Sequence, residues 1–165
     1  MLRKIAITMS MLFVLAPSVG HAFKTATHVW VGQQVLEDVV PDGRVTIPPF
    51  GEFAVRPDIV AALRSYPNEF RMGNVGPDGF PDIVTGQITV HPGVPNHWQA
   101  DDWLKWITQP GMRPQDLAFA YGYLGHAAAD VFAHTYINSY SGDIFNLKDG
   151  EDFVEKRHIG LESFI

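Results

Sequence analysis

The sequence predicts an all-α fold, a multi-helix bundle with one long loop that is rich in glycine and proline. Apolar residues recur at intervals of three and four in several segments, which is the spacing of an amphipathic helix. Glycine and proline are concentrated between residues 73 and 96, where they prevent long regular elements. Hydrophobic residues make up 46% of the 165 residues and charged residues 18%, so the composition is that of a globular chain.

The composition also excludes several classes of function. The chain has no cysteine, which excludes a disulfide scaffold, a cysteine-ligated zinc finger and a cysteine nucleophile. Its formal net charge of -6 disfavours nucleic-acid binding, because such binding relies on attraction between basic side chains and phosphates.

Residues 1–22 have the pattern of a secretory signal peptide. Arg3 and Lys4 precede an apolar run from Ile5 to Ala16, and Gly20-His21-Ala22 is a typical cleavage site. We therefore expect residues 1–22 to be removed and residues 23–165 to form a secreted or periplasmic domain. The alternative is an uncleaved N-terminal anchor.

Several shorter segments have helical patterns. Helices are expected over Thr27–Val39, Pro57–Tyr66 and Trp98–Ile107. Residues 41–57 contain four prolines and are expected to form a loop, and residues 73–96 a longer one. Because long loops in compact domains are usually functional, the second loop is expected to bear metal ligands or line a pocket.

The strongest helical pattern begins at Pro114 and reaches about Asn138. Proline suits the first turn of a helix, and alanine and aromatic residues occupy all faces of this one, so we expect it to be central and buried. Gly122 and Gly125 would let another helix approach closely. A last helix is expected over Glu151–Ile165, where the pattern stops without a cap, which suggests that a further segment follows.

The histidines and acids form a recurring pattern on these helices. His126, Asp130 and His134 are spaced four residues apart, which places all three on one helix face. Because this helix is expected to be buried, a bound cation would offset the cost of burying these groups. The last helix repeats the spacing with His158 and Glu162. The alternative is a set of hydrogen-bonded core histidines without metal.

Other ligand types occur elsewhere in the chain. His28 continues the apolar stripe of the first helix, and the long loop contributes Asp78, His91 and His97. Asp82 and Asp101 are interpreted more simply as turn and helix-start residues. Several helices and a loop thus offer imidazole or carboxylate groups toward one interior.

The order of these residues resembles the bacterial zinc-dependent phospholipase C family, which is structurally akin to zinc-dependent single-strand nucleases. The resemblance spans Phe23 to Glu162. It is carried by His28, the loop Asn74-Val75-Gly76-Pro77-Asp78, a loop histidine, the helix residues His126, Asp130 and His134, and the closing His158 and Glu162. It implies an all-helical fold that holds two to three zinc ions.

The resemblance also implies how the ligands are shared. One zinc would be held by the N-terminal amine and carbonyl of Phe23, by His28 and by Asp130. A second would be held by Asp78, a loop histidine, His126 and the bridging Asp130. A third would be held by His134, His158 and Glu162.

Two details of this ligand set differ from the family or stay open. His91 is slightly favoured over His97 as the loop ligand because its distance along the chain from Asp78 is closer to the family's usual gap. Three residues separate Asp130 from His134, where better-studied members have five. This difference concerns the geometry of the third site.

The function expected from these features is that of an exported zinc-dependent phosphoesterase. A zinc-activated hydroxide would hydrolyse a phosphodiester, with a phospholipid as the favoured substrate, and Asp78 would orient or deprotonate the water. The alternatives are a nuclease with the same metal core, and a non-catalytic metal-stabilised domain of a larger surface protein. Peripheral membrane contact through Trp98, Trp103 and Trp106 is an option, although their spacing favours a core face.

Overall fold

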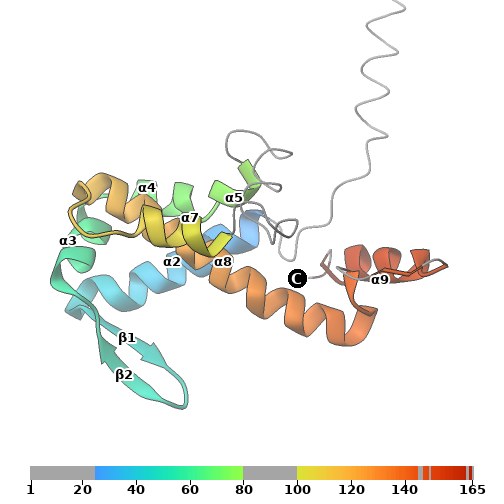
Figure 1. Cartoon of the computed structure of the whole chain (residues 1–165). Helices are drawn as coiled ribbons and strands as arrows, with labels where there is room; N and C mark the ends of the chain where they lie inside the picture. Colours follow the sequence, from blue (N-terminus) through green and yellow to red (C-terminus); the bar gives the residue numbers. More distant parts are fainter. Residues whose placement is uncertain (1–24, 80–99, 145–146, 149, 163, 165) are drawn as a thin grey trace, which may run out of the picture.

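The structure is a computed structural model that describes residues 25–79, 100–144, 147–148, 150–162 and 164. These residues form seven helices and one two-stranded sheet, so the all-α expectation is confirmed (Figure 1). The helices are α2 (Thr25–Asp42), α3 (Pro57–Ser65), α4 (Pro67–Gly73), α5 (Gly76–Gly79), α7 (Ala100–Ile107), α8 (Pro114–Ser141) and α9 (Asp152–Glu162).

The expected loop over residues 41–57 is wrong, because most of it is a β-hairpin. Strand β1 (Arg44–Ile47) pairs antiparallel with β2 (Gly51–Ala54), with Arg44 opposite Ala54. Val45, Thr46 and Ile47 are β-branched and favour strands. The prolines of this segment lie outside both strands, where they remove no hydrogen bond between them.

The expected loop over residues 73–96 is also partly structured at its start. Residues 67–73 form α4, which the sequence did not predict, and Gly76–Gly79 form the short helix α5. Residues 80–96 of the loop lie outside the described residues.

The main core lies where α8 crosses α2, α3 and α4. It contains Leu36, Val39, Ile59, Val60, Ala62, Leu63, Phe70, Leu117 and Ala118. Glycines let α4 and α8 touch, because a Cβ on Gly122 would lie 2.0 Å from the carbonyl oxygen of Phe70. A Cβ on Gly73 would lie 2.1 Å from the carbonyl oxygen of Phe119. The close approach expected at Gly122 is therefore confirmed.

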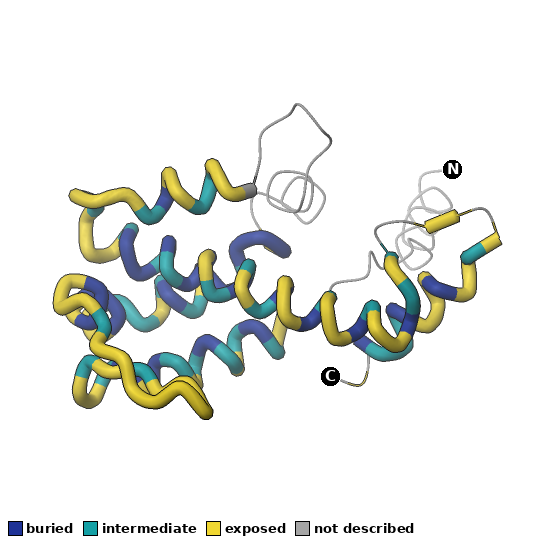
Figure 2. The backbone as a smooth tube through the Cα atoms, turned by 60° about the horizontal axis from the view of Figure 1, so that its bottom comes forward, coloured by how far each residue is buried: buried dark blue, intermediate teal, exposed yellow. Residues whose placement is uncertain are grey.

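The expectation that α8 is central is confirmed, because every other described helix packs on it, but the expectation that it is buried is wrong for part of its surface. Leu124, Val131, Phe132, Tyr136 and Tyr140 are exposed, and Figure 2 shows exposed residues recurring along the helix. Figure 1 shows that α8 runs on beyond the other described helices to reach α9, so fewer elements surround its C-terminal half. The apolar composition of α8 is typical of a buried helix. How much of a helix is buried, however, depends on how many neighbouring elements pack against it.

An apolar groove of about 650 Å³ lies beside the core, between α2, α3, α8 and the hairpin. Its lining is almost wholly aliphatic and aromatic, and includes Val35, Ile59, Leu63, Tyr121 and Phe132.

The tryptophans divide between core and surface. Trp103 packs edge-on against Tyr123, with ring centroids 5.9 Å apart, as a core residue would. Trp106 stacks on Trp103 but is 56% exposed, and Trp98 lies outside the described residues. Among the described residues, no helix combines the length and the apolar character needed to cross a membrane.

Candidate metal centre

Helix α8 brings two buried ligand-type residues against α2. The first group consists of His28 from α2 and of His126 and Asp130 from α8, and all three are buried. One carboxylate oxygen of Asp130, Oδ1, lies 3.3 Å from Nε2 of His28, and the other, Oδ2, lies 3.2 Å from Nε2 of His126. Asp130 therefore contacts both imidazoles at once, as a bridging ligand would.

Asp78 reaches this group from the short helix α5. Its Oδ1 lies 3.8 Å from Nε2 of His126, and the residue is only 5% exposed. A Cβ on Gly76 would lie 2.3 Å from the ring of Tyr123 on α8. Glycine at this position thus lets the backbone that carries Asp78 lie directly on α8.

A backbone carbonyl determines how the ring of His126 is used. Nδ1 of His126 lies 2.8 Å from the carbonyl oxygen of Asn74. Because a carbonyl oxygen only accepts hydrogen bonds, Nδ1 must donate, and the neutral ring then has its lone pair on Nε2. That lone pair faces the carboxylates of Asp130 and Asp78. Three acceptor atoms meet there, an arrangement that a proton or a cation stabilises.

The pKa of His126 reflects this crowding. Burial is the largest single influence and acts to lower the pKa, whereas the hydrogen bond and negative charge of Asp130 act to raise it. The Asn74 carbonyl and Asp78 add to the effect, so the pKa of the His126 imidazole is raised above its ordinary value. The surroundings of His126 thus stabilise positive charge.

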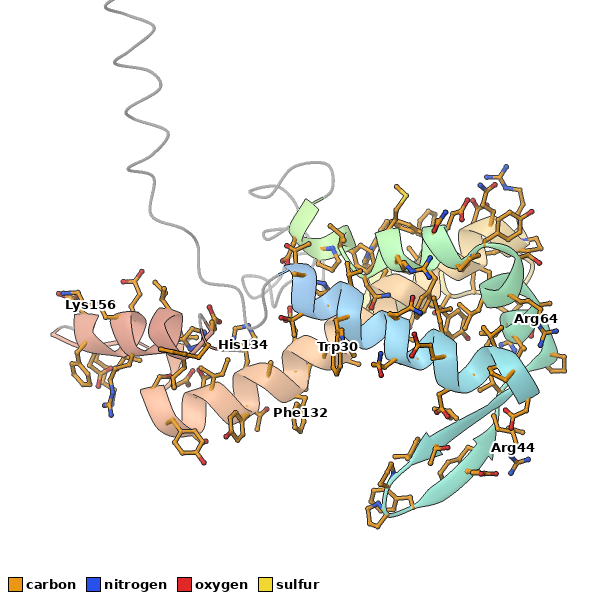
Figure 3. The ribbon with its side chains drawn as sticks, turned by 180° about the vertical axis from the view of Figure 1, so that it is seen from behind. Trp30, Arg44, Arg64, Phe132, His134 and Lys156 are labelled. Carbon is orange, nitrogen blue, oxygen red and sulfur yellow. The ribbon has the colours of Figure 1, made fainter. Side chains whose placement is uncertain are left out.

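A second group lies farther along α8. It consists of His134 from α8 and of His158 and Glu162 from α9. Nε2 of His158 lies 2.6 Å from Oε1 of Glu162, and the rings of His134 and His158 stack with centroids 5.3 Å apart. Figure 3 labels His134 on the part of α8 that runs beside α9. The spacing of three residues between Asp130 and His134 therefore still places His134 beside the ligands of α9.

Burial affects His158 directly. It lowers the pKa of the His158 imidazole, which favours the neutral, metal-binding form of the ring. Nδ1 of His158 lies 3.5 Å from the hydroxyl of Ser141, on the last turn of α8.

The donor atoms of both groups fit zinc. In each group, one ligand atom from every residue lies within 4.8 Å of the others. Imidazole nitrogen and carboxylate oxygen are ordinary zinc ligands. Burying these groups would be costly without a partner of positive charge.

Some predicted ligands are not placed by the structure. Phe23, His91 and the alternative loop ligand His97 lie outside the described residues, so their roles stay predictions. Asp82, interpreted as a turn residue, also lies outside them. Asp101 is exposed in the first turn of α7, in keeping with its interpretation as a helix-start residue.

Three residues near the groups were given no role of their own by the sequence. Asn74 contacts His126 through its backbone carbonyl, which no side-chain pattern reveals. Ser141 lies beside His158. Asn138 is one turn beyond His134, and its Oδ1 is buried with no hydrogen-bond partner among the described residues. The four-residue spacing from His126 through His134 continues to Asn138 and was the available signal.

Comparison with known protein families identifies a family with the same kind of metal chemistry. A family described as zinc-dependent phospholipase C matches residues 27–164. The chain belongs to this family. No curated protein and no solved structure gives a significant match.

Membership of this family offers a reason for the two groups of ligand-type residues, because the family depends on zinc. The matched segment contains all of His28, His126, Asp130, His134, His158 and Glu162. A zinc-dependent hydrolase family therefore accounts for clustered imidazoles and carboxylates inside a helical protein.

Proposed function

We propose that this protein is an exported zinc-dependent phosphoesterase that hydrolyses a phosphodiester, with a phospholipid as its substrate. The observation that carries the proposal is the pair of ligand groups along α8, in which every residue but the half-buried His134 is buried, in a chain of the zinc-dependent phospholipase C family. Because both groups use neighbouring residues of one helix, they could hold more than one cation for a reaction that needs several metal ions.

The chain's own residues have distinct parts in this proposal. Asp130 holds the first group together, because its two oxygens contact the imidazoles of His28 and His126. Asp78 is the carboxylate that orients the attacking water or accepts its proton, since it adjoins His126 from a different element. When bound, zinc ions acidify water and neutralise phosphoryl oxygens.

A zinc count and a hydrolysis assay test the proposal together. We expect two to three zinc ions per chain in the purified protein, and release of phosphocholine from phosphatidylcholine. Asp78→Asn should strongly reduce hydrolysis. The matched control is Asp116→Asn, on the first turn of α8, where Asp116 pairs with Arg113. It should change neither zinc content nor hydrolysis.

The same assays separate the alternatives. Degradation of single-stranded DNA without release of phosphocholine would assign the centre to a nuclease. Bound zinc with no hydrolysis of either substrate would indicate a structural role, as in the closed sites of metal-stabilised domains. A purified protein that contains no zinc, and whose thermal stability does not change when a chelator is added, would contradict the whole proposal.

Export and membrane contact belong to the proposal as well. Export predicts that the protein recovered outside the cytoplasm begins at Phe23, which N-terminal sequencing would show. Exposed apolar side chains support contact with phospholipid: Trp30 on α2 is 62% exposed and Phe132 on α8 is 70% exposed (Figure 3). Phe132→Ser should then weaken co-sedimentation with phosphatidylcholine vesicles, and equal binding would contradict the contact.

A further inference from the structure

Asn74 occupies the junction of the elements that carry the first group. It follows the last residue of α4, precedes α5, and is 2% exposed. An asparagine so deeply buried must use its polar atoms, because unpaired polar groups are costly in the interior.

The end of α4 anchors both the backbone and the side chain of Asn74. The backbone N–H of Asn74 donates to the carbonyl oxygen of Phe70 over 3.1 Å, and the side-chain Nδ2 donates to the same oxygen over 2.9 Å. The carbonyl of Asn74 accepts the hydrogen bond from Nδ1 of His126 over 2.8 Å. The side-chain amide therefore helps to hold the carbonyl that orients His126.

The same side chain separates α2 from α8. A Cβ on Gly32 of α2 would lie 2.6 Å from Nδ2 of Asn74, and a Cβ on Gly125 of α8 would lie 3.2 Å from its Oδ1. Gly32 is one turn after His28, and Gly125 directly precedes His126. The amide thus fills the space between the helices beside the two imidazoles, whose rings stack with centroids 3.6 Å apart.

We propose that Asn74 is a positioning residue for zinc binding at the first group. It acts in two ways: its carbonyl holds His126 in the tautomer with the proton on Nδ1, and its amide sets the spacing at which His28 and His126 both reach Asp130. Hydrogen-bond partners of this kind orient metal-binding histidines and strengthen their binding. The inference rests on the proposed zinc chemistry, but it concerns metal binding and is tested without the phosphoesterase reaction.

The test is Asn74→Ala in the full chain, with Asn68→Ala as the control because Asn68 is exposed on α4, the helix that Asn74 follows. Zinc is titrated into metal-free protein while the side-chain NMR signals of each histidine are followed. We expect zinc binding at His28 and His126 to weaken about 10- to 100-fold, and binding at His134 and His158 to be unchanged.

The tautomer of His126 provides a readout that loss of stability alone would not move. In metal-free wild-type protein, the ring nitrogen shifts of neutral His126 should show the proton on Nδ1. In Asn74→Ala they should show a mixture of both tautomers, whereas Asn68→Ala should match the wild type. An Asn74→Ala protein with wild-type zinc affinity and a single tautomer would overturn the inference.

Gly32→Ala keeps the inference testable if Asn74→Ala does not fold. Alanine is the better helix former, and its methyl group must displace the Asn74 amide, so zinc binding at the first group should again weaken selectively. Unchanged affinity in a folded Gly32→Ala protein would contradict the spacing role. Zinc binding that depends on Asn74, in a protein without phosphoesterase activity, would uphold the inference and reject the proposed function.

Discussion

The two candidate metal groups have similar ligands but very different surroundings. Around the first, α2, α4 and α5 all pack on α8, and the rings of His28 and His126 stack with centroids 3.6 Å apart. The second joins α8 to α9, and the rings of His134 and His158 are 5.3 Å apart. The first group thus depends on a crossing of several elements, whereas one helix pair forms the second. Changes in packing should therefore disturb the first group more than the second.

The largest effect is expected at Asp130, which contacts both imidazoles of the first group. Asp130→Asn should remove zinc from the first group, leave the second group loaded, and lower phosphodiester hydrolysis by about 100-fold or more. Elemental analysis and a phosphocholine-release assay measure the two quantities. A loss exceeding one zinc equivalent would support bridging, and wild-type zinc content would remove Asp130 from the centre.

A large effect on folding is expected at the crossing itself. Gly122→Ala places a methyl group against the backbone of Phe70 and forces α4 away from α8. We expect the free energy of unfolding to fall by about 3 kcal/mol, the upper part of the range for overpacking. Urea denaturation measures the change, and an unaltered midpoint would show that α4 and α8 can accommodate a methyl group where they cross.

A smaller effect is expected beside the second group. Ser141→Ala removes a hydroxyl that lies 3.5 Å from Nδ1 of His158, which is long for a hydrogen bond. Zinc binding at the second group should weaken by about 10-fold or less, with no change at the first. Zinc titration followed through the histidine NMR signals provides the measurement, and weakening at both groups would mean that the groups are coupled.

The smallest effect is expected on α9, where a glycine has room for a side chain. A Cβ on Gly160 would meet no heavy atom of the described residues within 4 Å. Gly160→Ala should raise the free energy of unfolding of the metal-free protein by about 0.5–1 kcal/mol, because alanine loses less backbone entropy. Urea denaturation in parallel with Gly122→Ala makes the contrast direct, and a loss of stability would show that Gly160 lies against a neighbouring element.

The helical part of the fold was largely predictable. Thr27–Val39 was expected as a helix and α2 covers Thr25–Asp42, because its apolar residues follow the helical period closely. Four prolines hid the hairpin between α2 and α3, since their number indicated a loop while their positions leave both strands intact. The exposed face of α8 was missed because composition does not show how many elements surround a helix.

The candidate site was predictable where it follows helix geometry and hidden where it does not. The spacing of His126, Asp130 and His134 placed them on one face. The spacing alone did not show that this face serves two groups. The family resemblance implied that division, and in the structure His134 joins α9 while its helix neighbours join α2. Asn74 was named only as part of a loop, because its contact with His126 is made by a backbone carbonyl.

The amino-acid sequence alone determined the helical class and the shared face of the α8 ligands, since a regular helix converts spacing along the chain into position in space. The family resemblance implied that His28 and Asp78 join the first group and that α9 completes the second, but spacing along the chain did not. Only the tertiary structure brings these residues together and places Asn74 between α2 and α8. These outcomes depend on close approach at glycines and on backbone atoms far apart in the chain, and neither has a periodic signature in the sequence.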